Sequence, residues 1–215
     1  MRWFSLFLSL LGAIILSSCA HEEPSRQEKF LAAAPRSILV VPVVNKSVDV
    51  TAADYMLSTV SFPLAEHGFY VFPVNLVKRM LEDDGLADSS LVHSSSTTKL
   101  AALFGADAVL YITIERWDAK YSVISTTVTV GASYEIRDAK TNTVIWKNKA
   151  EVVYKPDSGG GGNPIASLIS AVVSAAIAKA APDYMPLARQ ANNNALHPYP
   201  GNGIPPGPYA PRVEK

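Results

Sequence analysis

Hydrophobic and polar positions follow one period in the first half of the chain and another in the second. The first half opens with a nearly continuous apolar run at 37–45, which predicts a strand buried on both faces. Pro42 lies inside this run and, because proline donates no backbone hydrogen bond, predicts a bulge or an edge there. Apolar residues then recur at every fourth position (Met56, Val60 and Leu64), and a second apolar run follows at 69–74. A strand, a helix and a strand in close succession predict a βαβ unit with a right-handed crossover.

Shorter signals complete this half. Pro63 should kink the predicted helix or split it near Phe62. Short helices are predicted from Asn75 to Leu81 and from Thr98 to Phe104, and a third strand at 108–117.

A long alternating pattern runs from Tyr121 to Arg137. One face is apolar, with Val128, Val130, Ala132, Tyr134 and Ile136, and the other is polar, with Thr127, Thr129, Ser133, Glu135 and Arg137. This pattern predicts an antiparallel strand with one face in water, and a polar turn at 138–142 precedes the return strand. The expected fold class is α/β (α+β): a mixed β-sheet flanked by helices, with a long antiparallel hairpin.

A C-terminal apolar helix is predicted after the glycine run at 158–162. Its stripe has helical spacing and consists of Ile165, Leu168, Ile169, Val172, Val173, Ala176 and Ile177. One interpretation is a helix that packs on the sheet. The other is a surface for self-association or membrane contact, because the back of the helix is alanine and serine with little charge. The segment is short for a membrane span.

The amino terminus predicts export and lipidation. Residues 1–18 have the charge, apolar stretch and small residues of a signal peptide. The sequence Leu-Ser-Ser-Cys ending at Cys19 looks like the lipobox of bacterial lipoproteins, and Cys19 is the single cysteine of the chain. We therefore expect Cys19 to carry lipid, with several acyl chains because one chain anchors only marginally.

The residues after Cys19 predict the location and the domain organisation. Ala20 follows the cysteine, so the aspartate that retains many lipoproteins in the inner membrane is absent, and we expect the outer membrane, facing the periplasm. Residues 19–35 are predicted to be a tether, 36–190 a single globular domain, and 191–215 a proline-rich disordered tail.

The amino-acid composition argues against two classes of protein, disordered chains and nucleic-acid-binding proteins. The 215 residues are 48% hydrophobic and 18% charged, with 19 basic and 19 acidic side chains. A disordered chain would be less hydrophobic and carry more net charge. A nucleic-acid-binding protein would concentrate positive charge, and no run of lysine and arginine occurs here. We expect no nucleic acid as a partner.

No motif predicts catalysis, a metal or a cofactor. The four histidines (His21, His67, His93 and His197) lack the close spacing of a helical zinc pair. His67 follows Glu66 directly, but adjacent helix positions do not face each other. The glycine run lacks the lysine of a phosphate-binding loop, and the acidic residues Glu82, Asp83, Asp84 and Asp88 depart from the spacing of an EF-hand. We interpret these segments as a hinge and a solvated helix end.

Three segments, at 41–74, 104–118 and 134–151, resemble a family of bacterial lipoproteins of unknown function known from a neisserial genome-derived antigen (DUF799-type). The last two also resemble TolB N-terminal-like and CsgG-like periplasmic domains. The resemblance implies a mixed sheet flanked by helices that contacts envelope proteins and is not an enzyme. It favours a scaffold or adaptor of an envelope transport or secretion assembly. The alternative is a regulator of a peptidoglycan synthase.

The first prediction concerns the anchor. Replacing Cys19 with alanine removes the sulfur that would carry the lipid, so the protein should leave the membrane fraction and be recovered dissolved. Fractionation of cells followed by immunoblotting measures this. A Cys19→Ala protein that stays in the membrane fraction would refute lipidation as the anchor.

Overall fold

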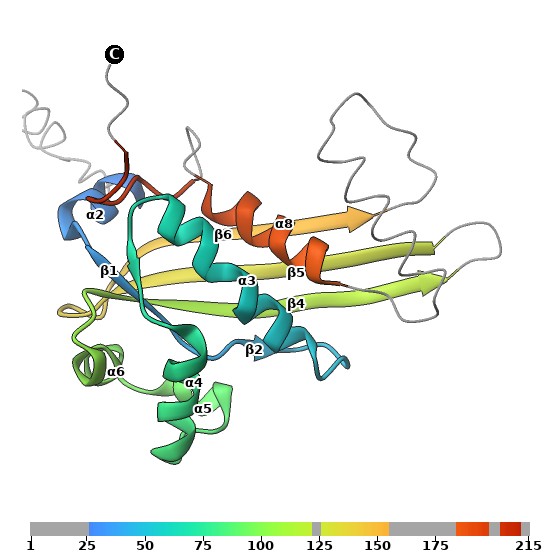
Figure 1. Ribbon diagram of the computed structural model, residues 1–215, viewed down its shortest axis with the longest axis horizontal. Coiled ribbons are helices and arrows are strands. Elements are labelled where there is room, and N and C mark those ends of the chain that lie inside the picture. Colours follow the sequence, from blue (N-terminus) through green and yellow to red (C-terminus); the bar gives the residue numbers. More distant parts are fainter. Residues whose placement is uncertain (1–25, 122–125, 155–183, 198–202, 212–215) are drawn as a thin grey trace, which may run out of the picture.

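A mixed β-sheet runs through the centre of the molecule (Figure 1). The computed structural model describes residues 26–121, 126–154, 184–197 and 203–211. Its strands in this part of the chain are β1 (Ser37–Val40), β2 (Val44–Asn45), β3 (Tyr70–Val71), β4 (Ala108–Tyr121), β5 (Thr126–Asp138) and β6 (Val144–Tyr154). They lie in the order β3-β1-β4-β5-β6, and β2 pairs with β4 further along.

Helices flank the sheet. They are α2 (Arg26–Ala33), α3 (Ala52–Glu66), α4 (Val74–Asp83), α5 (Ser89–Ser94), α6 (Thr97–Phe104) and α8 (Met185–Leu196). The expected fold class, a mixed sheet flanked by helices with a long antiparallel hairpin, is confirmed.

The parallel part of the sheet follows the predicted βαβ unit. β1 pairs in parallel with β3 on one side and with β4 on the other. The apolar run at 37–45 is divided at Pro42 into β1 and β2, as the missing proline N–H requires. The run at 69–74 yields only the two residues of β3, because Pro73 occupies the cap position of α4.

The helix α3 packs against the sheet through the predicted stripe. Met56, Val60 and Leu64 are all fully buried. The expectation that Pro63 could split the helix is wrong, since α3 continues through it to Glu66. Pro63 is itself buried, so packing of the last turn offsets the backbone hydrogen bond that the proline removes.

The long hairpin has the predicted dry face. The five residues from Val128 to Ile136 on that face are at most 3% exposed. The predicted start of the strand is wrong, because Tyr121 is the last residue of β4 and β5 begins at Thr126. The pairing of β4 with β5 shifts register between Ile114 and Arg116, so Glu115 occupies a bulge on the polar side.

Part of the expected tether is folded. Residues 26–33 form α2, because Phe30 is buried against the edge of the Phe69 ring, with 5.8 Å between ring centroids and 85° between planes. One buried aromatic residue does not produce a helical period in the sequence. The pattern at 19–35 therefore predicted a polar linker and not a helix.

Part of the expected tail is folded as well. Residues 191–196 belong to α8, and Ile204 is buried. Further along, Gly207 N–H donates to the carbonyl oxygen of His67 (2.7 Å) and Tyr209 N–H to that of Gly68 (3.0 Å). Gly68 has a φ of +83°, and a Cβ there would overlap the backbone of Ala210, so glycine permits this close approach.

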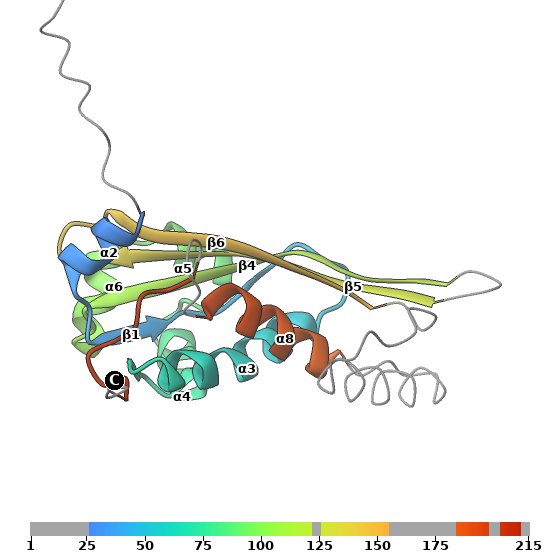
Figure 2. The ribbon, with the colours of Figure 1, turned by 90° about the horizontal axis from the view of Figure 1, so that it is seen from above.

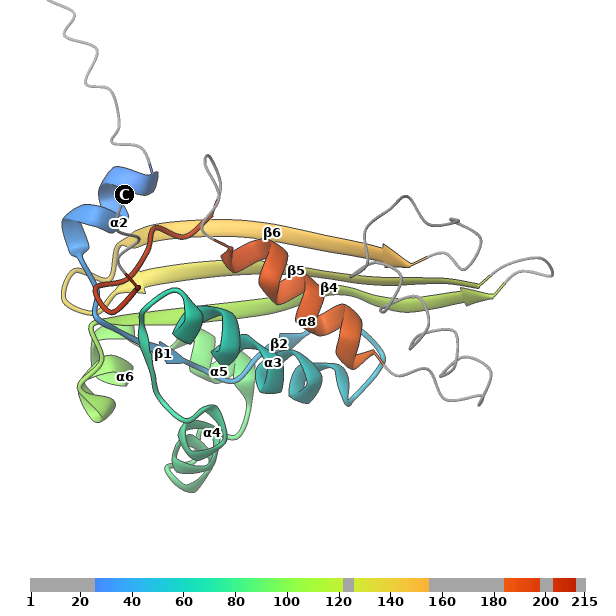
Figure 3. The same cartoon turned by 45° about the horizontal axis from the view of Figure 1, so that its top comes forward.

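One buried amide joins α8 to α3 and β5. Figures 2 and 3 show α8 beside α3 on the same side of the long strands. Asn192 is fully buried; its Nδ2 donates to the Met56 carbonyl oxygen (3.0 Å) and to Thr59 Oγ1 (2.8 Å). Its Oδ1 accepts from the hydroxyl of Tyr134 at 2.9 Å, and burial raises the pKa of Tyr134, so that hydroxyl stays a donor.

The second prediction follows from this junction. Asn192→Ala removes three buried hydrogen bonds, including the oxygen that accepts from the Tyr134 hydroxyl, and this loss should lower the free energy of unfolding by about 2 kcal/mol or more. Urea unfolding followed by circular dichroism measures it.

Asn194→Ala is the matched control, because Asn194 is exposed on the same helix and should change stability by at most about 0.5 kcal/mol. Equal effects of the two substitutions would contradict the role of the buried amide.

Candidate functional site

The two faces of the sheet are covered unequally. α2, α3 and α8 pack on one face along the long strands, and the largest apolar cluster lies there. On the other face α4, α5 and α6 pack near β1 and the start of β4, around Leu39, Val109 and Tyr111. Figure 1 shows α5 and α6 near the end of the sheet where β4 begins. Beyond them, no helix of the described residues packs on this second face, which we call the open face.

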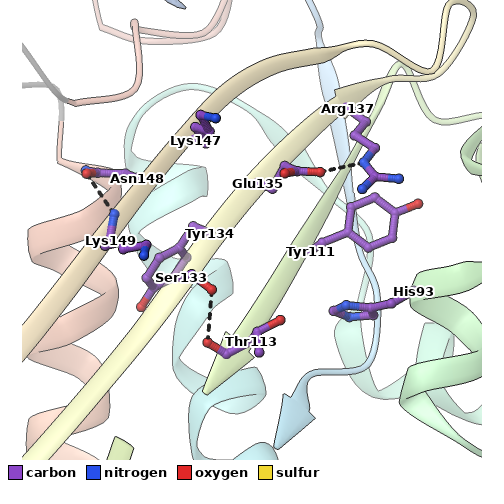
Figure 4. A pocket seen from close by; sticks show the side chains of 10 residues that line it. All are labelled: His93, Tyr111, Thr113, Ser133, Tyr134, Glu135, Arg137, Lys147, Asn148 and Lys149. Carbon is purple, nitrogen blue, oxygen red and sulfur yellow. Dashed lines mark hydrogen bonds and ion pairs between the residues drawn. The ribbon is translucent and has the colours of Figure 1, made fainter. Parts of the chain in front are cut away.

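A hollow of about 510 Å³ lies on the open face next to α5 (Figure 4). It is formed by β4, β5, β6 and the one histidine of α5. Its lining residues are His93, Tyr111, Thr113, Ser133, Tyr134, Glu135, Arg137, Lys147, Asn148 and Lys149. Two of them, Tyr134 and Asn148, bond through their side chains to α8 on the opposite face of the sheet.

Arg137 is fixed at one end of the hollow. Its Nε donates to Glu135 Oε1 at 2.6 Å, and its guanidinium lies over the Tyr111 ring at 4.9 Å from the centroid. The Arg137 and Glu135 side chains are each 32% exposed, so water screens the pair and it contributes little to stability. Its effect is geometric, because the stacked and hydrogen-bonded guanidinium keeps one orientation.

Tyr111 and His93 form the aromatic wall. The Tyr111 hydroxyl hydrogen-bonds to Thr97 Oγ1 at 2.9 Å, and burial raises the pKa of Tyr111. The His93 ring meets the Tyr111 ring edge to face, with centroids 5.1 Å apart. His93 Nε2 lies 2.9 Å from the carbonyl oxygen of Pro42, so Nε2 carries the hydrogen. Burial lowers the pKa of His93, and the ring is neutral at pH 7.

Lysines form the far side of the hollow. Lys147 and Lys149 follow each other at strand spacing on β6 and lie opposite Glu135 and Ser133 of β5. Just outside, Glu115 accepts from Lys46 Nζ (2.9 Å) and from Ser133 Oγ (3.0 Å). The bond from Lys46 lowers the pKa of Glu115, which keeps this carboxylate charged.

The residues singled out in the sequence have different outcomes. Cys19 and the stripe from Ile165 to Ile177 lie outside the described residues. His67 lies beside His197, with 5.6 Å between ring centroids, and its pKa is lowered first by burial and then by that histidine.

Two acidic residues of the segment at 82–88 contribute to helix structure. Asp88 caps α5 by accepting from Ser90 N–H at 2.7 Å, and Asp83 pairs with Arg79 at 3.4 Å. In the described ranges, no group of three or more histidine, cysteine, aspartate or glutamate side chains is placed to hold a metal ion. Nor does any helix in those ranges have the length and apolarity to cross a membrane.

The sequence pattern did not predict the hollow. The alternation places Ser133, Glu135 and Arg137 on a wet face, but it cannot tell that α5 brings His93 to that face. The available signal is the polar side of the hairpin combined with the expected pairing of its strands.

Known proteins resemble this chain over most of its length. The family model described as "Putative lipoprotein GNA1162-like" matches residues 27–209. A curated protein of Neisseria meningitidis serogroup B, "Putative lipoprotein NMB1124/NMB1162", is 32% identical over 94% of this chain and 95% of its own length. The crystal structure of the lipoprotein GNA1162 from Neisseria meningitidis is similar at a TM-score of 0.56 and 32% identity, covering 67% of this chain and 99% of that one.

Acid should lower the free energy of unfolding through His93. The unfolded chain binds a proton at His93 near the ordinary pKa of 6.5, whereas the folded chain binds it only at lower pH. Stability is therefore fully present above pH 6.5 and should fall as the pH decreases through and below that value.

His93→Gln keeps a donor for the Pro42 carbonyl but cannot titrate, so the fall should become shallower in urea unfolding measured from pH 8 to pH 5. The dependence that remains should shrink further when His67→Gln is added, since burial lowers the pKa of that histidine too. An unchanged pH profile in His93→Gln would contradict the burial of a neutral ring.

Proposed function

This chain belongs to the GNA1162-like lipoprotein family, and on that premise we propose that it acts in the cell envelope as a non-catalytic scaffold or adaptor of a transport or secretion assembly. Lipid on Cys19 holds it at the membrane. Ala20 in place of an aspartate favours the outer membrane, with the domain facing the periplasm.

The open face carries this proposal. It is a sheet surface that carries several ion pairs, among them Lys46 with Glu115 at 2.9 Å and Arg116 with Glu151 at 3.3 Å. Paired exposed charges keep a surface hydrated, and the same charges supply complementary contacts to a partner. A surface of this kind suits reversible protein contact.

The chemistry of the hollow supports a role without catalysis. His93 is neutral and its Nε2 is engaged by the Pro42 carbonyl, and Ser133 Oγ donates to Glu115. A serine nucleophile needs a base within hydrogen-bond reach that is itself oriented by a third group. Ser133 reaches Glu115, which Lys46 orients, but the bond from Lys46 lowers the pKa of this carboxylate and makes it a weak base.

Self-association is the second contact we propose, through the apolar stripe from Ile165 to Ile177. Its support is the sequence pattern, in which apolar residues continue onto a weakly polar second side of the predicted helix.

The fourth prediction tests the open face in cells. A photoreactive amino acid placed at Lys149 should crosslink to subunits of an envelope transport or secretion assembly. The same amino acid at Arg189, an exposed residue of α8 on the other side of the sheet, is the matched control and should capture much less.

Mass spectrometry of the captured proteins separates the outcomes. A peptidoglycan synthase captured from position 149 would favour the alternative function, a regulator of that enzyme. Equal capture from positions 149 and 189, or none from 149, would contradict contact through the open face.

A further inference from the structure

Exposed apolar side chains gather at the end of the molecule where α2 meets the C-terminal segment at 203–211. Leu31 of α2 is 56% exposed and Tyr209 is 63% exposed. A small hollow of about 220 Å³ lies between the two segments, and none of its lining residues has a charged or polar side chain. Figure 3 shows α2 and the last described residues together at one end of the sheet. We call the surface formed by the exposed residues of 30–35 and 203–211 the apolar end.

The apolar end is uncharged and ordered. Residues 30–35 and 203–211 contain no aspartate, glutamate, lysine or arginine. The C-terminal segment is held in place by contacts that do not involve its exposed side chains, because Ile204 is buried and the Tyr209 N–H donates to the Gly68 carbonyl oxygen at 3.0 Å. The Tyr209 ring is thus largely exposed on a fixed backbone. An exposed apolar patch on ordered backbone indicates contact with a partner or a membrane.

The expected anchor lies close to the apolar end. Arg26, where α2 begins, is seven positions after Cys19. A fully extended chain spans at most about 3.6 Å per residue, so the start of α2 lies within about 25 Å of the lipid expected on Cys19. By comparison, the 14 residues of β4 extend over about 48 Å at about 3.4 Å per residue. Figure 1 shows α2 at the end of the sheet where β4 begins, so the tether brings this end to the bilayer while the far ends of the long strands can stand away from it.

From the exposed apolar side chains, the lack of charge and the short tether, we infer that the apolar end is seated on the membrane surface, with Leu31 and Tyr209 among the lipid headgroups. The inference rests on the proposed function, because it requires the lipid on Cys19. Leucine and tyrosine side chains are favoured at the boundary between headgroups and acyl chains.

A second contact with the bilayer orients the domain. An acyl anchor on a flexible tether leaves the domain free to turn, whereas an additional contact on the same surface holds one end of the sheet against the lipid. The open face runs along the long strands, on the side of the sheet opposite to α2, and therefore stays accessible to a partner in the periplasm.

The fifth prediction uses the full mature lipoprotein in vesicles of phosphatidylethanolamine and phosphatidylglycerol. Tyr209→Cys supplies one free thiol for a fluorophore, because Cys19 would carry lipid. A phospholipid with a nitroxide near its headgroup quenches a fluorophore that reaches the bilayer surface. Quenching at position 209 should be several-fold stronger than at Val48→Cys, a position that is 98% exposed and lies just before α3, at the opposite end of that helix from Gly68. It should persist at high salt, because the contact is apolar.

Leu31→Asp in the protein labelled at position 209 tests whether the two segments meet the bilayer together. A carboxylate is costly to remove from water and is repelled by phosphatidylglycerol, so quenching at position 209 should fall several-fold. Leu91→Asp is the matched variant, because Leu91 is similarly exposed, at 53% against 56% for Leu31, but belongs to α5. It should leave the quenching unchanged, and circular dichroism verifies that both variants fold.

Several results would overturn the inference. These are equal quenching at positions 209 and 48, equal effects of Leu31→Asp and Leu91→Asp, or quenching that high salt abolishes. A fluorophore at position 209 that is shielded from a water-soluble quencher but not quenched by the nitroxide lipid would also overturn it, because protein would then cover this end.

Labelling of the protein without an added cysteine separates these failures from failure of the proposed anchor. If the thiol reagent modifies Cys19 itself, the lipid is absent, and the anchor and the inference fail together. If Cys19 is not modified and position 209 is not quenched, lipidation stands and the seating of the apolar end alone is wrong.

Discussion

A single side-chain amide, buried between two helices and a strand, determines how the layers of this molecule fit together. Asn192 makes hydrogen bonds to α3 and β5 from a fully buried position. An amide left unpaired in apolar surroundings costs more free energy than a paired one returns. The α8 helix is therefore restricted to the register that satisfies all three partners, and in that register it seals one face of the long strands.

Because α3 and α8 cover one face of the long strands, the opposite face carries polar side chains. The side chains of a strand alternate between faces, so the strands that bury Tyr134 and Ile136 must present Ser133, Glu135 and Arg137 on the opposite side. The helices α4 to α6 pack where β1 and the start of β4 are apolar on both faces. The polar remainder gains nothing from a helix, because its ion pairs are already hydrated and contribute little to folding. Covering this surface with a helix would therefore add little to the stability of the fold. We infer that its ordered charges serve contact with a partner rather than folding.

The elements that the sequence predicted are those whose hydrophobic residues recur at short, regular spacings. Apolar runs, the helical stripe of α3 and the alternation of β5 each reflect packing against a neighbour close along the chain. The elements it missed depend on distant partners. Phe30 of α2 finds Phe69, and α8 buries mostly small residues around Asn192, a composition that looks polar. The close approach of the tail to Gly68 depends on the fold around it.

The site was predicted only in part for the same reason. The polar face of the hairpin follows from alternation, whereas its hollow depends on α5, a helix that the sequence did not predict. His93 is 51 positions from Pro42, the residue that holds its ring, and no periodicity connects them. The expected lipidation of Cys19 depends instead on its immediate neighbours in the sequence, and it stays a prediction.

We propose that a partner covers the open face while the lipid-anchored protein is in the cell. Because Cys19 is the single cysteine and would carry lipid, Lys149→Cys and Arg189→Cys each introduce one free thiol. The rates at which a small membrane-permeant maleimide labels these thiols in intact cells and in purified protein show whether a partner covers position 149 in the cell. If a partner covers the open face, position 149 should react much more slowly in cells than after purification while position 189 reacts alike in both. Equal protection of the two positions would contradict a partner on this face.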